Sequence, residues 1–156
     1  MIKQIILGII CAVILFSKSE GQSLTKKESQ IIRLAIDTFT LQHDHTPGPK
    51  VQEFILIVLE VDSNGIISRV NIMADQRRVD KIYPILQQLE PKVFHNRVFS
   101  GCKNKLLLIP FVTYSANRPG DFYTRTALNA FRRMFEGENA IILPTIQYVL
   151  DEYHSD

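Results

Sequence analysis

The sequence contains no tryptophan and only two cysteines, Cys11 and Cys102. Cys11 lies in an apolar N-terminal segment, so the rest of the chain has a single cysteine and cannot form an internal disulfide. The protein must therefore be stabilised by its hydrophobic core. A free cysteine is usually buried, and burial is the favoured interpretation of Cys102; an intermolecular bridge is the alternative.

The sequence also has no large excess of positive or negative charge. The chain has 18 Lys and Arg against 16 Asp and Glu, a formal net charge of +2. This balance lacks the basic surface that nucleic acid or anionic lipid requires, so nucleic-acid binding is disfavoured. The sequence has no Gly-rich phosphate loop, nucleophile elbow or zinc-protease motif. We therefore predict no catalytic, cofactor-binding or metal-binding residues, and no cofactor.

The N-terminal segment has the three parts of a secretory signal peptide. Lys3 precedes an unbroken apolar run from Ile5 to Phe16, and polar residues follow at once. Ser19 and Gly21 supply the small side chains that a signal peptidase accepts. Cleavage is expected before Gln22.

We therefore predict a signal peptide over residues 1–21 and a single α+β domain over residues 22–156, which is periplasmic or extracellular after cleavage. An uncleaved anchor is the alternative. Twelve helical residues rise about 18 Å, however, against a hydrocarbon core of roughly 30 Å. Lipidation of Cys11 is disfavoured because the preceding Ile10 is not small.

The first mature segment is predicted to be a helix. Thr25 and Glu28 have the spacing of a capping box, in which each satisfies a backbone donor of the other. A turn-rich loop at residues 43–49 ends the helix. The apolar residues at helical spacing are Ile32, Ala35, Ile36 and Phe39.

A β-hairpin over residues 52–74 is the strongest local pattern. An apolar strand from Phe54 to Val61 is followed by Asp62-Ser63-Asn64-Gly65, and Asn-Gly tolerates the positive φ of a tight turn. The first strand is apolar on both faces, which indicates a central position. The return strand is predicted to place Ile66, Ser68, Val70, Ile72 and Ala74 on one face, and Ile67, Arg69, Asn71 and Met73 on the other.

Four further elements complete the predicted architecture. Helices are expected over residues 79–90 and 122–136, and strands over residues 105–114 and 141–148. The fold class is α+β, with an antiparallel sheet built on the hairpin and packed by two or three helices. Pro110 and Pro144 lie inside the two later strands, and a proline restricts a strand to an edge or a bulge.

The order of strand, Asp-x-Asn-Gly turn, strand, helix and Pro-containing strand resembles the C-terminal domain of TonB-type energy transducers. The matching residues are Val61–Ile67, the helix Ile82–Leu89 and Ile109-Pro110-Phe111, and the resemblance covers about residues 52–114. It implies a ββαβ core. It also implies that a partner is engaged by adding a short strand to an edge of the sheet.

Two departures limit what the resemblance implies. The family usually has a Ser-Ser-Gly-like segment after the hairpin and Leu-Asp before the helix, whereas this chain has Ala74-Asp75-Gln76-Arg77-Arg78 and Val79-Asp80. An energy transducer also needs a retained anchor and a long spacer, and residues 17–50 contain no such spacer. The fold is expected to carry over, but energy transduction is not.

Two groups of residues could carry metal or thiol chemistry. His43 and His45 could bind a metal if the segment is extended, but a structural zinc site requires four ligands, so a solvated loop is favoured. Cys102 could act as a nucleophile with His95, since Lys103 and Lys105 lie nearby. No third orienting group or oxyanion hole accompanies them.

Two further groups have structural explanations that we favour. Glu60 and Asp62 could serve as paired carboxylates, although Asp62 fits a turn role better. A set of aromatic and Arg residues could form a binding interface, but we favour an amphipathic helix with Phe in the core and Arg in water. The set comprises Phe122, Tyr123, Phe131, Phe135, Arg125, Arg132 and Arg133.

The sequence favours an exported, non-enzymatic binding or envelope-associated protein whose mature form does not span the membrane. Its expected partner is an envelope protein, recognised by strand addition along residues 106–114 or 141–148. One alternative is a small exported hydrolase or thiol enzyme that uses Cys102 and a histidine. The other is a cystatin-like or cone-shaped domain that binds a small ligand in an apolar pocket.

Overall fold

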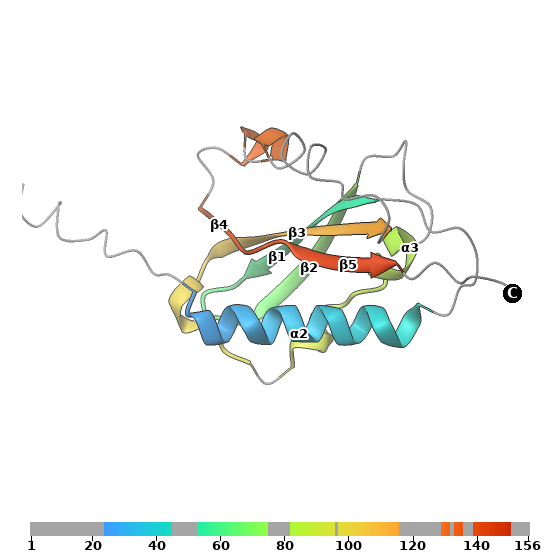
Figure 1. Ribbon diagram of the computed structural model, residues 1–156. Helices are drawn as coiled ribbons and strands as arrows, with labels where there is room; N and C mark the ends of the chain where they lie inside the picture. The colour runs from blue at the N-terminus through green and yellow to red at the C-terminus, as the bar shows by residue number, and fades with distance from the viewer. Residues whose placement is uncertain are drawn as a thin grey trace, which may run out of the picture.

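The computed structural model describes residues 24–44, 53–74, 82–95, 97–115, 129–131, 133–135 and 139–150. The predicted signal peptide lies outside these residues. One long helix, α2, covers one face of a five-stranded sheet, and the short helical pieces at residues 129–131 and 133–134 lie over the other face (Figure 1). The elements are α2 (Lys26–His43), β1 (Phe54–Val61), β2 (Ile67–Ala74), α3 (Ile82–Leu86), η1 (Pro91–Phe94), η2 (Ser100–Cys102), β3 (Lys105–Ser115), β4 (Ala140–Ile142) and β5 (Ile146–Leu150).

Helix α2 begins at the predicted capping box. The Thr25 side chain accepts a hydrogen bond from the Glu28 N–H over 3.2 Å, and Glu28 Oε2 accepts one from the Thr25 N–H over 2.8 Å. Two of the orphan donors at the helix start are thereby satisfied. The predicted apolar face is confirmed, because Ile32, Ile36 and Phe39 are buried against the sheet.

The hairpin of β1 and β2 is confirmed. The Gly65 N–H donates to the Asp62 carbonyl over 3.1 Å, and the Asp62 N–H donates to the Ile66 carbonyl over 2.9 Å. Gly65 has a φ of +84°, while Asn64 does not share this left-handed conformation. Gly65 therefore makes the turn possible, since a residue with a Cβ resists positive φ.

The face assignment at the start of β2 was wrong for two residues. The β1–β2 register shifts between Glu60 and Val61, so Val61 pairs with Ile67. Ile67 is consequently buried in the core, whereas Ile66 is 49% exposed. A bulge adds a residue to one strand and reverses the alternation beyond it. Further along β2, the apolar residues of the predicted core face pack against the core as expected. They are Val70, Ile72 and Ala74.

The sheet is mixed, and this corrects the predicted antiparallel arrangement. The strand order is β2-β1-β3-β4, with β5 also paired to β3. β1 runs antiparallel to β2 and β3, but β3 runs parallel to β4 and β5. The α+β class and the central position of β1 are confirmed. Residue patterns indicate where strands form, but they do not fix the direction in which a later strand returns.

The second predicted helix, over residues 79–90, ends earlier than expected. α3 spans Ile82–Leu86, and residues 79–81 lie outside the described residues. The chain then continues in i→i+3 turns, with Gln88 and Leu89 donating to the carbonyls of Ile85 and Leu86. Such turns tighten and end a helix. The apolar stripe of Ile82, Leu86 and Leu89 is nevertheless buried. Of the helix predicted over residues 122–136, the described residues 129–131, 133 and 134 are helical.

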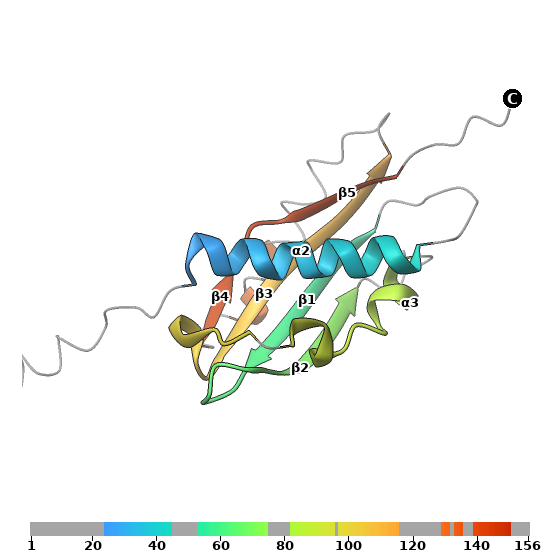
Figure 2. The same cartoon turned by 90° about the horizontal axis from the view of Figure 1, so that it is seen from below.

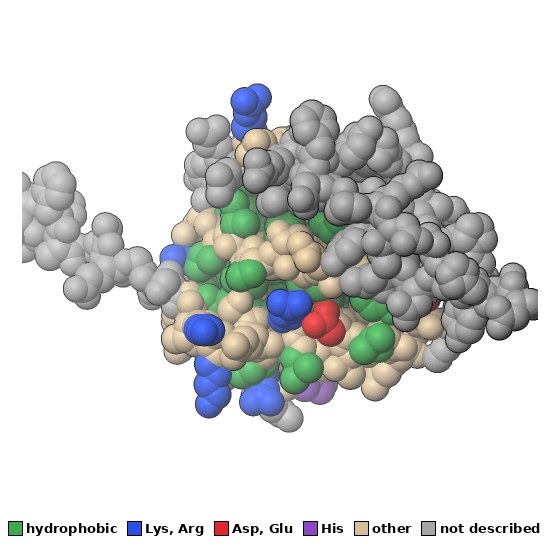
Figure 3. Space-filling model, in the orientation of Figure 1, with side chains coloured by type: hydrophobic (Ala, Val, Ile, Leu, Met, Phe, Trp, Pro, Cys, Tyr) green, Lys and Arg blue, Asp and Glu red, His purple; other side chains and the backbone are tan. Residues whose placement is uncertain are grey.

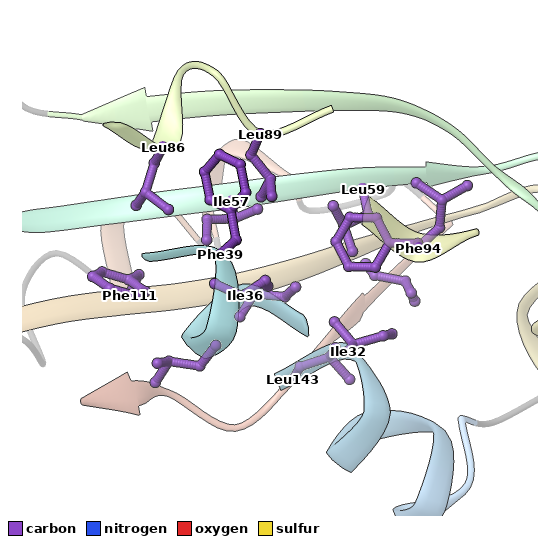
Figure 4. Packing of buried hydrophobic residues seen from close by; sticks show 14 of the residues in the cluster. Ile32, Ile36, Phe39, Ile57, Leu59, Leu86, Leu89, Phe94, Phe111 and Leu143 are labelled. Atoms are coloured by element: carbon purple, nitrogen blue, oxygen red, sulfur yellow. The ribbon is translucent and has the colours of Figure 1, made fainter. Parts of the chain in front are cut away.

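The main core lies between α2 and the sheet. Figure 4 shows Ile32, Ile36 and Phe39 of α2 directed toward Ile57 and Leu59 of β1. α2 crosses this face of the sheet, with α3 and η1 beside it on the β2 side (Figure 2). Each buried Ile, Leu or Phe contributes about 1.5–3 kcal/mol relative to an exposed one, so this layer supplies most of the apolar stabilisation.

A smaller cluster lies on the opposite face of the sheet. Leu56, Val58 and Leu108 are buried there, with Phe131 packed against them. The ring of Phe131 stacks on Phe54, with centroids 5.3 Å apart. The two clusters explain why β1 is apolar on both faces.

Candidate functional site

Strand β3 lies inside the sheet and not at its edge. β1 pairs with one side of β3, and β4 and β5 pair with the other. Pro110 therefore lies beside an edge of the sheet and not at one. Residues 106–108 and 111–114 already pair with β4 or β5 on this side, so β3 offers no template for an added strand and the predicted strand addition along residues 106–114 is wrong.

Pro110 faces the break between β4 and β5. The Leu106 N–H donates to the Asn139 carbonyl over 3.0 Å, and the Leu108 carbonyl accepts from the Leu143 N–H over 2.8 Å. Backbone groups alternate in direction along a strand, so Pro110 also presents its backbone to this side. β4 has ended at this position and β5 has not begun. The proline's missing N–H therefore leaves the ladder intact.

β4 and β5 form the edge of the sheet on this side. Among the described residues, no strand pairs with their outer side. The N–H of Leu143 bonds to β3, and backbone groups alternate in direction, so those of Ile142 point away from β3. The register of β5 likewise directs the backbone groups of Gln147 away from β3. The predicted single strand over residues 141–148 is thus two short strands, interrupted around the exposed Pro144.

A groove of about 530 Å³ separates this edge from the first half of α2. We call it the α2–edge groove. Figure 3 shows hydrophobic side chains gathered on this face of the molecule, beside α2. The described part of its lining contains no Asp or Glu and comprises Leu24, Thr25, Lys26, Ser29, Gln30, Ile32, Arg33, Ile109, Ile141, Ile142, Leu143, Pro144 and Ile146. An apolar groove with a polar rim is typical of a binding site.

The far ends of α2 and β5 are tied together. Tyr148 donates a hydrogen bond from its hydroxyl to Asp44 Oδ2 over 3.0 Å. Its ring stacks on Phe111 of β3, with centroids 6.1 Å apart. The edge strand is therefore joined to the C-terminal end of α2, at the opposite end of the helix from the groove.

Cys102 is completely buried, as the sequence favoured. Its thiol donates to the Phe99 carbonyl over 3.4 Å. Burial raises the pKa of the Cys102 thiol to about 11, and the charge of Glu28 acts in the same direction. His95, the proposed partner, is exposed. A protonated, buried thiol is a poor nucleophile.

Glu60 and Asp62 do not form a carboxylate pair. Glu60 Oε1 lies 3.5 Å from Arg69 Nη1 and accepts from Asn71 Nδ2 over 3.1 Å. Asp62 Oδ1 accepts from the N–H groups of Asn64 and Ile66, over 2.8 and 2.9 Å. The bond from Ile66 is the main reason why the pKa of Asp62 is lowered. Asp62 thus has the predicted turn role.

The predicted histidine pair is not brought to a metal site within the described residues. His43 Nδ1 donates to the Phe39 carbonyl over 2.8 Å, and its ring stacks on Phe39. His45 lies outside the described residues. No cluster of three or more potential metal ligands occurs in the described part of the chain.

Only part of the predicted aromatic and arginine set can be placed. Phe131 and Phe135 are half-buried against the smaller core cluster, and Arg133 is exposed. This arrangement is the amphipathic helix that the sequence favoured. The remaining members lie outside the described residues: Phe122, Tyr123, Arg125 and Arg132.

Glu53 is a buried carboxylate that sequence reasoning missed. It is 2% exposed and accepts hydrogen bonds from the N–H groups of Tyr83 and Ile82, over 3.1 and 3.4 Å. Its own N–H donates to Thr113 Oγ1 over 2.7 Å. Glu53 thus joins the start of β1 to α3 and β3. No local pattern reveals these contacts, because the partners are distant in sequence.

The sequence matches no protein-family model, and neither curated proteins nor solved structures gave a match to it. Within the described residues, no helix combines the length and hydrophobicity needed to cross a membrane.

Proposed function

We propose that the protein is an exported, non-enzymatic binding module that recognises an extended segment of an envelope protein. The segment adds as a strand to the outer side of β5. The observation that carries this proposal is the α2–edge groove, which lies between a helix and an edge of the sheet that no strand of the described residues covers. Strand addition beside a helix provides main-chain affinity and side-chain specificity together.

The geometry indicates what kind of segment fits. Alternate side chains of an added strand point to the same face of the sheet, so every second residue of the partner enters the groove. The groove floor is apolar, with Ile109, Leu143 and Ile146 among its members, and Lys26 adds a cation at the rim. The preferred segment therefore has apolar residues at alternate positions and an acidic residue near Lys26.

Pro144 restricts the length of the pairing. A proline has no N–H, and the strand is interrupted around it. The added segment therefore pairs with Ile146–Leu150 of β5 and does not continue as one ladder along Ala140–Ile142. The same interruption disfavours uncontrolled pairing between edges of different copies.

The expected setting follows from the N-terminal sequence. We propose that residues 1–21 direct export and are removed, and that the mature chain does not span the membrane. The resemblance to TonB-type C-terminal domains supports strand addition as the recognition mode. The buried Cys102 gives no support to a thiol enzyme.

The test removes one outward-facing N–H. Gln147→Pro deletes the donor on the outer side of β5, and Gln147→Ala is the matched control that keeps it. Residues 22–156 are used to capture partners from an envelope fraction, and amide exchange is measured on the complex. We expect new protection at residues 140–150, and loss of capture with Gln147→Pro but not with Gln147→Ala.

Two results contradict the proposal. In the first, a captured partner protects only helix faces and leaves β4 and β5 unchanged. In the second, Gln147→Pro, folded by circular dichroism, captures the partner as well as the wild type does. Either result assigns binding to another surface.

A further inference from the structure

We propose that a second groove, on the opposite side of α2, binds a single-chain carboxylate amphiphile such as a medium-chain fatty acid. This groove has a volume of about 480 Å³ and lies between α2 and the η1 region. We call it the α2–η1 groove. Its lining residues on η1 and beyond are Val93, Phe94, His95 and Arg97, and those on α2 are Ile31, Leu34, Ala35, Thr38, Phe39 and Gln42.

The two grooves are independent. Along α2, the residues facing the core lie between two stripes. One stripe, which includes Ser29 and Arg33, lines the α2–edge groove; the other, which includes Leu34 and Thr38, lines the α2–η1 groove. At 100° per residue these stripes flank the buried face on either side. The present proposal therefore does not rest on strand addition.

The floor of the α2–η1 groove suits an apolar chain. Phe39 and Phe94 are buried beneath it, and Ile31 and Val93 are half-buried. Leu34 is 67% exposed at its border. Covering this border removes apolar surface from water, at about 25 cal/mol for each Å². The volume lies in the range of small-molecule sites, which are commonly about 300–1,000 Å³.

The charge in the groove specifies the head group. Among the described residues that line it, Arg97 and His95 are the charged or ionisable ones, and none of them is Asp or Glu. Within the described part of the chain, Arg97 forms no ion pair. A guanidinium binds a carboxylate through two parallel hydrogen bonds. Thr38 and Gln42 add neutral hydrogen-bonding groups. An anionic head therefore binds at Arg97, while the chain lies over Leu34 and Phe39.

The probe is dodecanoate, used below its micelle concentration and measured by calorimetry with residues 22–156. Dodecanol and dodecyltrimethylammonium have the same chain with a neutral or a positive head. We expect dodecanoate to bind most tightly. Arg97→Gln should weaken it by about tenfold, which corresponds to about 1.4 kcal/mol, because the charged partner of the carboxylate is removed. Arg133→Gln, the same change at an exposed arginine outside both grooves, should leave the affinity unchanged.

A second variant tests the chain contact. Leu34→Gln replaces an exposed residue and so preserves the fold, and it should weaken dodecanoate and dodecanol alike. The proposal is overturned if dodecanoate does not bind, or if it binds equally to Arg97→Gln. It is also overturned if dodecyltrimethylammonium binds as tightly as dodecanoate. Capture of an envelope partner is measured separately with Gln147→Pro, so failure of either proposal leaves the other intact.

Discussion

The hydroxyl of Tyr148, on the edge strand β5, is hydrogen-bonded to the carboxylate of Asp44 at the end of α2, over 3.0 Å. The bond holds an edge strand to the helix that faces it. Tyr148→Phe removes the hydroxyl but keeps the ring that stacks on Phe111. We expect the free energy of unfolding to fall by about 1 kcal/mol.

The measurement is urea denaturation together with amide exchange. Exchange should accelerate selectively at residues 146–150, because the edge loses a tether while the core is untouched. A variant that unfolds like the wild type, with unchanged exchange in β5, would show that the tether does not hold the edge.

Gly65→Val is expected to destabilise the fold by more than 1 kcal/mol. The residue has a φ of +84°, which a β-branched side chain resists, and an added Cβ would lie 3.1 Å from the Phe99 carbonyl oxygen. Ser63→Val, in the same turn but on an exposed residue, serves as the control. Equal thermal melts for Gly65→Val and wild type would refute the hairpin turn described here.

Glu53→Ala is expected to cost about 2–3 kcal/mol, because a buried carboxylate that accepts from two N–H groups is removed and the donors lose their partner. Glu90→Ala is the control, since its pairing with Lys92 lies at the surface. Chemical denaturation should separate the two variants clearly. Similar losses for both would mean that Glu53 does not link α3 to the sheet.

Cys102 should be unreactive in the native protein. Its pKa is raised from 9.0 to about 11, so the thiol stays protonated at neutral pH. Iodoacetamide at pH 8, followed by mass spectrometry, should modify the unfolded protein but not the folded one. Rapid labelling of the folded protein would refute the buried state.

The same shift predicts a pH dependence. The pKa of Cys102 is higher in the folded protein than in the unfolded one. The stabilisation that its protonated thiol contributes is therefore complete below about pH 9 and is lost as the pH rises toward 11. Denaturation at pH 8 and pH 10.5 should therefore show a smaller loss of stability for Cys102→Ala than for wild type. An identical loss in both would exclude the thiol as its source.

The mature chain is expected to begin at or near Gln22. Intact-mass measurement on protein from the producing cell tests this directly. A mass that includes residues 1–21, recovered in the membrane fraction, would contradict signal cleavage.

The parts of the fold that depend on neighbouring residues could be predicted from the sequence. The capping box of Thr25 and Glu28, the α2 core face and the Gly65 turn each depend on residues within a few positions of one another. The central position of β1 followed from its two apolar faces. Each of these features depends on a short stretch of sequence, and each prediction was confirmed.

Most of the features that the sequence did not predict depend on residues that are distant in the chain. The pairing of β3 with β4 and β5 decides that Pro110 is interior, and no local pattern contains that information. Glu53 is explained only by N–H groups some thirty positions away. The register shift between Glu60 and Val61 reversed the predicted alternation of inward and outward side chains at the start of β2. Both grooves arise between elements that are far apart in the chain or joined by irregular segments.

The parallel pairing of β4 and β5 with β3 has a consequence for the order of folding. The β1–β2 ladder closes across residues 62–66, whereas Leu106 and its partner Ala140 are 34 positions apart in the chain. Loop-closure entropy must be overcome before such distant contacts form. We therefore expect the edge strands to dock last, onto an assembled body of α2, the hairpin and β3. A chain arrested before that step would possess most of its core yet lack the edge at which we propose its partner binds.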